Sequence, residues 1–138
     1  MDKEVQEKQD LTTLRIEVEL LKQQLKDLEV YLQSLDDRLQ DLRLMVNALE
    51  EFSKVKTPAN ALIPLVSGVF VDGEIKNLEK VKVNVGAGVV VEKSLPEAID
   101  LLNKQILDLT AHRDDVVREF EKGVKALQER EQELYSYL

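Results

Sequence analysis

Few side chains in this sequence have the types and spacing that catalysis or metal binding requires. His112 is the only histidine and cysteine is absent, so no set of imidazole or thiolate metal ligands is indicated. Gly86-Ala87-Gly88 could suggest a phosphate-binding loop, but the further glycines and the final lysine followed by serine or threonine are missing. We therefore expect a turn at these glycines, no metal, no cofactor and no catalytic residue.

Carboxylates are plentiful, and a suitably placed pair could act as general acid and base. The chain has 27 Asp and Glu against 19 Lys and Arg, which gives a formal net charge of -8. Most of these residues fall on segments with a helical pattern, where they are typical of a solvated face and not of a cleft. The negative charge also disfavours binding to nucleic acid or to anionic lipid.

The ends and the composition of the chain indicate a cytoplasmic protein. Residues 1–10 are charged and polar, without the apolar stretch of a signal peptide. No apolar run approaches the roughly 20 residues of a membrane helix. The absence of cysteine fits a reducing compartment.

The elements that position these side chains begin with a heptad repeat over residues 1–56. Such a repeat makes a narrow apolar stripe and predicts a coiled-coil helix. Pro58 is expected to end it. The apolar positions, at spacings of three and four, are Leu11, Leu14, Val18, Leu21, Leu25, Leu28, Leu32, Leu35, Leu39, Leu42, Val46 and Leu49.

A second coiled-coil helix is predicted over residues 94–138. Ser94 and Glu97 have the spacing of a capping box, which marks a helix start. Its apolar positions are Ile99, Leu102, Ile106 and Leu109, and, after a four-residue step at Arg113, Val117, Phe120, Val124, Leu127, Leu134 and Leu138. Folded back antiparallel, the helices would place Arg113 near Asp36 and Asp37, and would pack less well toward the chain ends.

The segment between the helices, residues 61–93, changes to the two-residue period of β-strands. Two turns are possible in its middle. Asp72-Gly73 is a hairpin signal, and Lys76 to Glu79 is the alternative. We favour the second, with Gly73 as a bulge or kink inside a strand.

Short strands of this kind are marginally stable alone, so we expect them to combine between chains into a shared sheet or barrel. The predicted oligomerisation residues are Leu62, Ile63, Leu65, Val66, Val69, Phe70, Val71, Val81, Val83, Val85, Val89, Val90 and Val91.

Two stretches of the middle segment, Ala61 to Val71 and Val83 to Ser94, resemble the alpha-class signature of the prefoldin subunits, in an archaeal type. The resemblance covers nearly the whole chain and implies one prefoldin-like domain over residues 1–138. The expected fold is α+β and mainly α. It is a long antiparallel coiled-coil hairpin with a central segment of two β-hairpins that forms an oligomeric β-barrel.

The resemblance also implies a function and partners. Prefoldin subunits of this type assemble as two alpha and four beta subunits, hold unfolded proteins at their coiled-coil tips without ATP and pass them to a group II chaperonin. The alternative is a filament-forming scaffold of the same type. The tips would carry the client-binding residues Val5, Leu11, Leu14, Leu127, Leu134, Tyr135, Tyr137 and Leu138.

Overall fold

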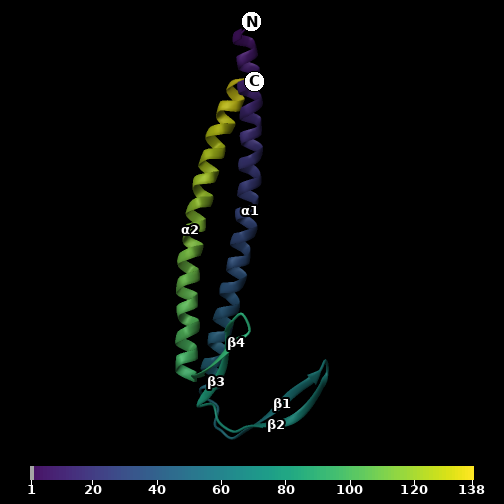
Figure 1. The fold of residues 1–138 in the computed structure, drawn as a ribbon, viewed down its shortest axis with the longest axis vertical. Coiled ribbons are helices and arrows are strands. Elements are labelled where there is room, and N and C mark those ends of the chain that lie inside the picture. Colours follow the sequence, from purple (N-terminus) through teal and green to yellow (C-terminus); the bar gives the residue numbers. More distant parts are fainter. Residues whose placement is uncertain (1) are drawn as a thin grey trace. The chain divides into compact units, whose positions relative to one another are not determined.

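A computed structural model describes residues 2–138, which form two long helices and two β-hairpins (Figure 1). In chain order the elements are α1 (Asp2–Phe52), β1 (Ala59–Val66), β2 (Val69–Ile75), β3 (Lys80–Gly86), β4 (Val89–Ser94) and α2 (Leu95–Ser136). The chain divides into two compact units. The first comprises the chain up to Arg38 together with Leu109–Leu138, and the second is Leu39–Asp108.

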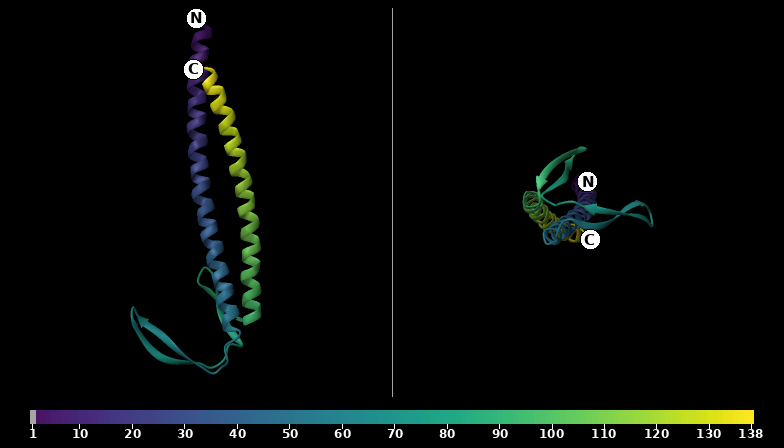
Figure 2. Two further views of the ribbon diagram at one scale, coloured as in Figure 1. Left: turned by 180° about the vertical axis from the view of Figure 1, so that it is seen from behind. Right: turned by 90° about the horizontal axis from the view of Figure 1, so that it is seen from below.

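In each unit a segment of α1 lies beside a segment of α2, and the two run in opposite directions (Figures 1 and 2). The predicted antiparallel arrangement of the helices is therefore confirmed. Every apolar heptad position predicted on α1 is buried or half-buried, with Leu42 the most deeply buried at 2% exposed. Burial of this single stripe stabilises α1, because a long polar helix gains little from intrinsic propensity alone.

The helix α1 ends at Phe52, earlier than the predicted position 56. The residues after it form tighter backbone bonds: the N–H of Lys54 donates to the carbonyl of Glu51, and the N–H of Val55 donates to that of Phe52. Such three-residue bonds are a common way to close a last turn. Pro58 follows soon after. The sequence therefore predicted the region in which the helix ends, but placed the end four residues too late.

The capping box at the start of α2 is confirmed. The N–H of Glu97 donates to the Ser94 hydroxyl over 3.2 Å, and the N–H of Ser94 donates to the Glu97 carboxylate over 3.2 Å. Each partner satisfies a backbone donor that the first turn of a helix leaves free. Interaction with the Ser94 side chain, and then with its backbone N–H, lowers the pKa of the Glu97 carboxyl below its ordinary value.

The packed face of α2 lies slightly to one side of the predicted one. Val116 is buried at 5% exposed, whereas the predicted Val117 is half-buried. Leu95 and Ala98, which the heptad assignment did not include, are buried with Leu102 in the second unit. The sequence offers two neighbouring apolar stripes on α2, and only the packing against α1 decides between them.

Strands β1 and β2 form the first hairpin, a separate two-stranded antiparallel sheet. Gly73 lies inside a strand, β2, as expected, but it pairs regularly with Ala61, so the register has no bulge at this residue. The register shifts instead between Pro64 and Val66, next to the turn. Gly73 has a packing role, because a Cβ atom there would collide with the side chain of Ile63.

Strands β3 and β4 form the second hairpin, and the chain between β2 and β3 turns at residues 76–79 as favoured. The tight turn after β3 consists of Ala87 and Gly88, with φ angles of 51° and 75°. Positive φ at both positions suits the right-handed twist of a hairpin, and glycine adopts it at little cost. Ala87 adopts it at a steric cost.

Candidate interaction surfaces

The hairpin of β1 and β2 has one continuous apolar face. Residues that pair directly across a hairpin lie on the same face. One face therefore carries the pairs Ala59–Ile75, Ala61–Gly73 and Ile63–Val71. The opposite face carries Asn60–Glu74 and Leu62–Asp72, so its apolar character is confined to Leu62 and the Pro64–Phe70 pair.

The hairpin of β3 and β4 has a similar division between its faces. Val81, Val83, Val89 and Val91 lie on one face, by direct pairing and by alternation along β4, and Lys93 lies at the end of this face opposite Val81. The other face carries the pairs Lys82–Glu92 and Asn84–Val90. Both hairpins thus have an apolar face and a more polar face, as strands that are covered on one side do.

The predicted oligomerisation residues are largely uncovered in the single chain. Those that are exposed are Leu62, Ile63, Leu65, Val66, Val69, Phe70, Val71, Val85, Val89 and Val90. Val81, Val83 and Val91 are half-buried. An apolar surface of this extent on a hairpin with free edges is typical of a protein–protein interface.

The predicted client-binding residues all lie in the first unit, in which the first turns of α1 extend past the end of α2 (Figure 2). Val5, Tyr135, Tyr137 and Leu138 are exposed, with Leu138 at 78%. Leu11, Leu127 and Leu134 are half-buried in the packed stripe, and Leu14 is buried at 6%. Contact of Leu14 with a client would require the helices to separate locally.

A shallow groove lies at the same end of the first unit. Leu14 and Thr13 of α1 and Tyr137 line it together with charged residues, among them Arg130 and Glu133. Arg130 Nε bonds to the Glu17 carboxylate over 3.1 Å and so links α2 to α1. Polar contacts of this kind are compatible with partial separation of the helices, because exposed ion pairs contribute little to stability.

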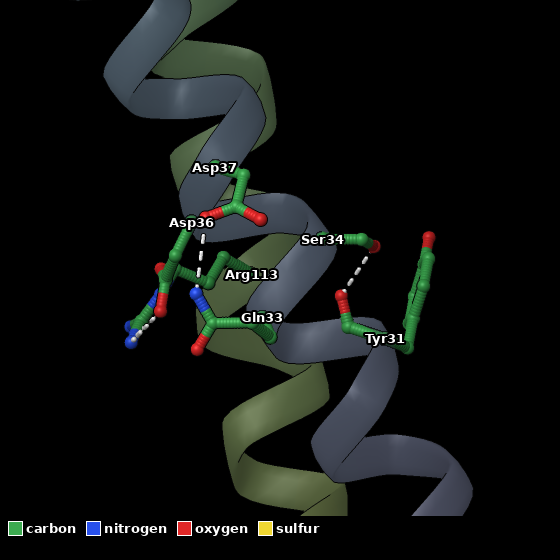
Figure 3. Close-up of polar contacts among 6 residues, drawn as sticks. All are labelled: Tyr31, Gln33, Ser34, Asp36, Asp37 and Arg113. Atoms are coloured by element: carbon green, nitrogen blue, oxygen red, sulfur yellow. Dashed lines mark hydrogen bonds and ion pairs between the residues drawn. The ribbon is translucent and has the colours of Figure 1, made fainter.

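A second polar cross-link lies further along the first unit. The Arg113 guanidinium bonds to both carboxylate oxygens of Asp36, and the contact from Nη2 measures 3.5 Å (Figure 3). This confirms the predicted pairing near the four-residue step. Asp36, chiefly through its hydrogen bond, raises the pKa of Arg113. The adjacent Asp37 accepts a bond from Gln33 of its own helix instead.

The contact between Tyr31 and His112 is absent from the expectations drawn from the sequence. The Tyr31 hydroxyl and His112 Nε2 are 2.7 Å apart, and the rings meet edge to face with centroids 5.8 Å apart. Both residues lie outside the heptad stripe, so periodicity gives no signal for them. Like the Asp36–Arg113 pair, this contact links α1 to α2 within the first unit.

Within residues 2–138 no three or more His, Cys, Asp or Glu side chains gather closely enough to hold a metal ion. In the same range no helix has a stretch long and apolar enough to cross a membrane.

The sequence of this chain matches the model of a known protein family. The family model Prefoldin, described as Prefoldin subunit, matches residues 21–136. This range includes most of both helices and all four strands, so the match rests on the hairpins as well as on the coiled coil.

Individual relatives agree with the family match. The chain is 33% identical over 89 residues to "Prefoldin subunit alpha" of Archaeoglobus fulgidus, covering 64% of this chain and 65% of that protein. It is 34% identical over 82 residues to the protein of the same name from Thermofilum pendens, covering 59% and 64%. The chain thus aligns with less than two thirds of the length of each relative.

A solved structure shares the fold. A chain of the "filamentous PFD from Methanocaldococcus jannaschii" superposes with a TM-score of 0.72, covering 84% of this chain and 96% of that one. The sequence identity is 21%, so the likeness concerns the fold alone.

Proposed function

We propose that this chain, which belongs to the prefoldin family, is an alpha-type subunit of a chaperone that holds unfolded proteins without ATP. The observation that carries the proposal is that each of the two units has an exposed apolar surface of its own. One lies on the β-hairpins and suits assembly; the other lies where α1 begins and α2 ends, and suits contact with clients. The similarity to archaeal alpha subunits supports the same function.

In the proposed assembly, two copies of this chain combine with four beta-type subunits, and their hairpins form a β-barrel. The whole chain would act as one prefoldin-like domain. The apolar hairpin faces would become the barrel interior, and the free strand edges would pair with strands of neighbouring subunits. This explains why residues such as Val71 and Val89 are uncovered in the single chain.

Client binding would take place at the predicted residues where the ends of the helices meet. Burial of apolar surface is not directional, so Tyr135, Tyr137 and Leu138 could contact many sequences. At about 25 cal/mol per Å², a few side chains give weak binding, and several subunits acting together would hold a client by avidity. Weak single contacts also permit release, in this proposal to a group II chaperonin in the cytoplasm.

The test is suppression of aggregation by the complex with a beta-type partner. Replacing Val5, Tyr135, Tyr137 and Leu138 by serine should strongly reduce suppression of the aggregation of a chemically denatured protein diluted without ATP. A matched control replaces exposed apolar residues elsewhere, Leu44 and Leu107, which are 59% and 70% exposed. Equal loss in both variants, or none in the first, would contradict the proposed client site.

A filament-forming scaffold is the alternative, favoured by the fold shared with a filamentous structure. Native mass spectrometry of the chain alone and with a beta-type subunit distinguishes the two. A closed hetero-hexamer supports the chaperone, whereas open-ended assemblies, seen as long filaments by electron microscopy, support the scaffold.

A further inference from the structure

A groove lies along the helices of the first unit, beside Gly123 and away from the predicted client-binding residues. It encloses about 550 Å³ and is open to solvent on one side. This volume is in the range of sites that accept a small ligand or a side chain. It is lined by Leu21, Gln24, Leu25, Asp27, Leu28 and Tyr31 of α1 and by Glu119 and Gly123 of α2.

Gly123 allows close packing between α1 and α2 at one edge of the groove. Glycine inside a helix costs about 1 kcal/mol relative to alanine, so its presence there calls for an explanation. A Cβ atom on Gly123 would lie only 2.6 Å from Cδ2 of Leu25. Leu25, 9% exposed, therefore packs directly against the backbone of α2. A larger residue at this position would meet Leu25, so the glycine permits this close contact.

The groove combines an apolar floor with an acidic rim. Leu21, Leu25 and Leu28 supply apolar surface, and Tyr31 adds an aromatic ring that is 43% exposed. Asp27 and Glu119, one on each helix, are exposed, and the residues lining the groove include no basic side chain. Gln23 donates to one oxygen of Asp27 over 3.0 Å, which leaves the second oxygen for another donor.

We propose that this groove is a second client site, which takes an apolar side chain of an unfolded segment that carries lysine or arginine beside it. The proposal rests on the chaperone function proposed above and specifies the kind of segment that the protein holds. The apolar side chain would cover Leu25 and Leu28, and the cation would lie between Asp27 and Glu119. A second copy of this chain fits less well, because its formal net charge is also negative, at -8.

Charge reversal on the assembled complex tests the rim. The probe is a fluorescent Gly/Ser peptide with a central Phe between two Lys, and its binding is followed by anisotropy. Asp27→Lys with Glu119→Lys should weaken binding roughly tenfold, since each exposed pair contributes a fraction of a kcal/mol. The same two substitutions should strengthen binding of a peptide with Glu in place of Lys.

The matched control is Glu29→Lys with Glu121→Lys, which makes the same change of charge on the same helices outside the groove. It should change binding of the Lys peptide less than about threefold. An equal effect of both double variants would show attraction by overall charge alone and overturn the proposal. So would a peptide with Ser in place of Phe that binds as well as the original.

Cross-linking tests the location. The chain has no cysteine, so a single Gln24→Cys carries a benzophenone at the groove, and Val30→Cys carries it outside. Preferential cross-linking of the Lys peptide at position 24 supports the site; equal cross-linking, or cross-linking to another copy of the chain, overturns it. Preferential cross-linking at position 24 in a complex that does not suppress aggregation would support peptide binding in the groove and contradict the proposed chaperone function. Suppression of aggregation without preferential cross-linking would support the chaperone function and contradict peptide binding in the groove.

Discussion

At the scale of single residues, two neighbouring aspartates have different roles although the sequence presents them alike. Asp36 reaches across to Arg113 of α2, whereas Asp37 accepts a bond from Gln33 within α1 (Figure 3). Only the first carboxylate joins the helices. The side chains of Asp36 and Arg113 are 44% and 35% exposed, so water screens the pair and the interaction is modest.

Substitution of these two aspartates measures the difference. Asp36→Asn should lower the midpoint of thermal unfolding by a few degrees, because Arg113 loses its charged partner. Asp37→Asn is the matched control and should leave the midpoint nearly unchanged, since an i,i+4 contact on an exposed helix face contributes little. Circular dichroism at 222 nm records both. Equal shifts would mean that the cross-link does not stabilise the helix pair.

Ser94 and Glu97 give a prediction about pH. The lowered pKa of Glu97 means that its charged form is stabilised by folding. Its contribution is complete above the ordinary value of 4.5 and is lost as the pH falls through the lower pKa of the folded state. In urea unfolding between pH 6 and pH 3, Glu97→Gln should therefore lose less stability than the wild type does.

The serine has its own effect at neutral pH. Ser94→Ala should cost about 1 kcal/mol of unfolding free energy, the usual loss for an N-cap. If Glu97→Gln showed the pH dependence of the wild type, the stabilisation of this carboxylate by the cap would be refuted.

At the scale of elements, the turn between β3 and β4 contains an avoidable strain. Ala87 has a φ of 51°, a conformation that costs an L-residue with a side chain roughly 1 kcal/mol. Ala87→Asn should stabilise the hairpin by up to about 1 kcal/mol, because Asn followed by Gly is the preferred pair for such a turn. The measurement is the unfolding midpoint of the assembled complex in guanidinium.

Substitution of the adjacent residue, Gly88, should change the stability of the hairpin in the opposite direction. Gly88, at a φ of 75°, is open to a side chain in space, so only its backbone conformation opposes substitution. Gly88→Ala should lower stability by about 1 kcal/mol. If both substitutions shifted the midpoint in the same direction, the positive φ angles would not be the cause.

The sequence predicted the features that depend on local signals. The three–four period placed the buried stripe of α1, and the Ser94 to Glu97 spacing placed the start of α2. The chain also turns at residues 76–79, the favoured one of two candidate turns. The pairing of Arg113 with Asp36 was also predictable from the sequence. Once the end of α1 and the start of α2 are set side by side, the antiparallel alignment of the two apolar stripes is fixed.

The remaining features depend on packing between elements. Val116 and Val117 are both suited to a core, and only the rotation of α2 against α1 decides which is buried. Gly73 looks like a bulge by residue type, yet it is explained by Ile63 of the neighbouring strand. The groove beside Gly123 could not be predicted either, since it depends on how side chains of α1 and α2 lie against each other.

At the scale of the whole molecule, the described chain carries more exposed apolar surface on its hairpins than a monomer ordinarily tolerates. The division of β3 and β4 into an apolar and a polar face predicts which side is covered in the assembly. Val89 and Val90 allow a direct test, because they are adjacent, of one type, and 52% and 56% exposed. They lie on opposite faces, Val89 with Val91 and Val90 with Asn84.

Lysine at each position should therefore have different effects on assembly. Val89→Lys places a charge where burial is expected, and should weaken association with a beta-type subunit at least about tenfold. Val90→Lys places the same charge beside Asn84 and should weaken it less than about threefold. Analytical ultracentrifugation measures both, and circular dichroism verifies that the helices remain folded. If Val90→Lys were the more damaging, the polar face would be the one that meets the other subunits, and the arrangement of the barrel proposed above would have to be inverted.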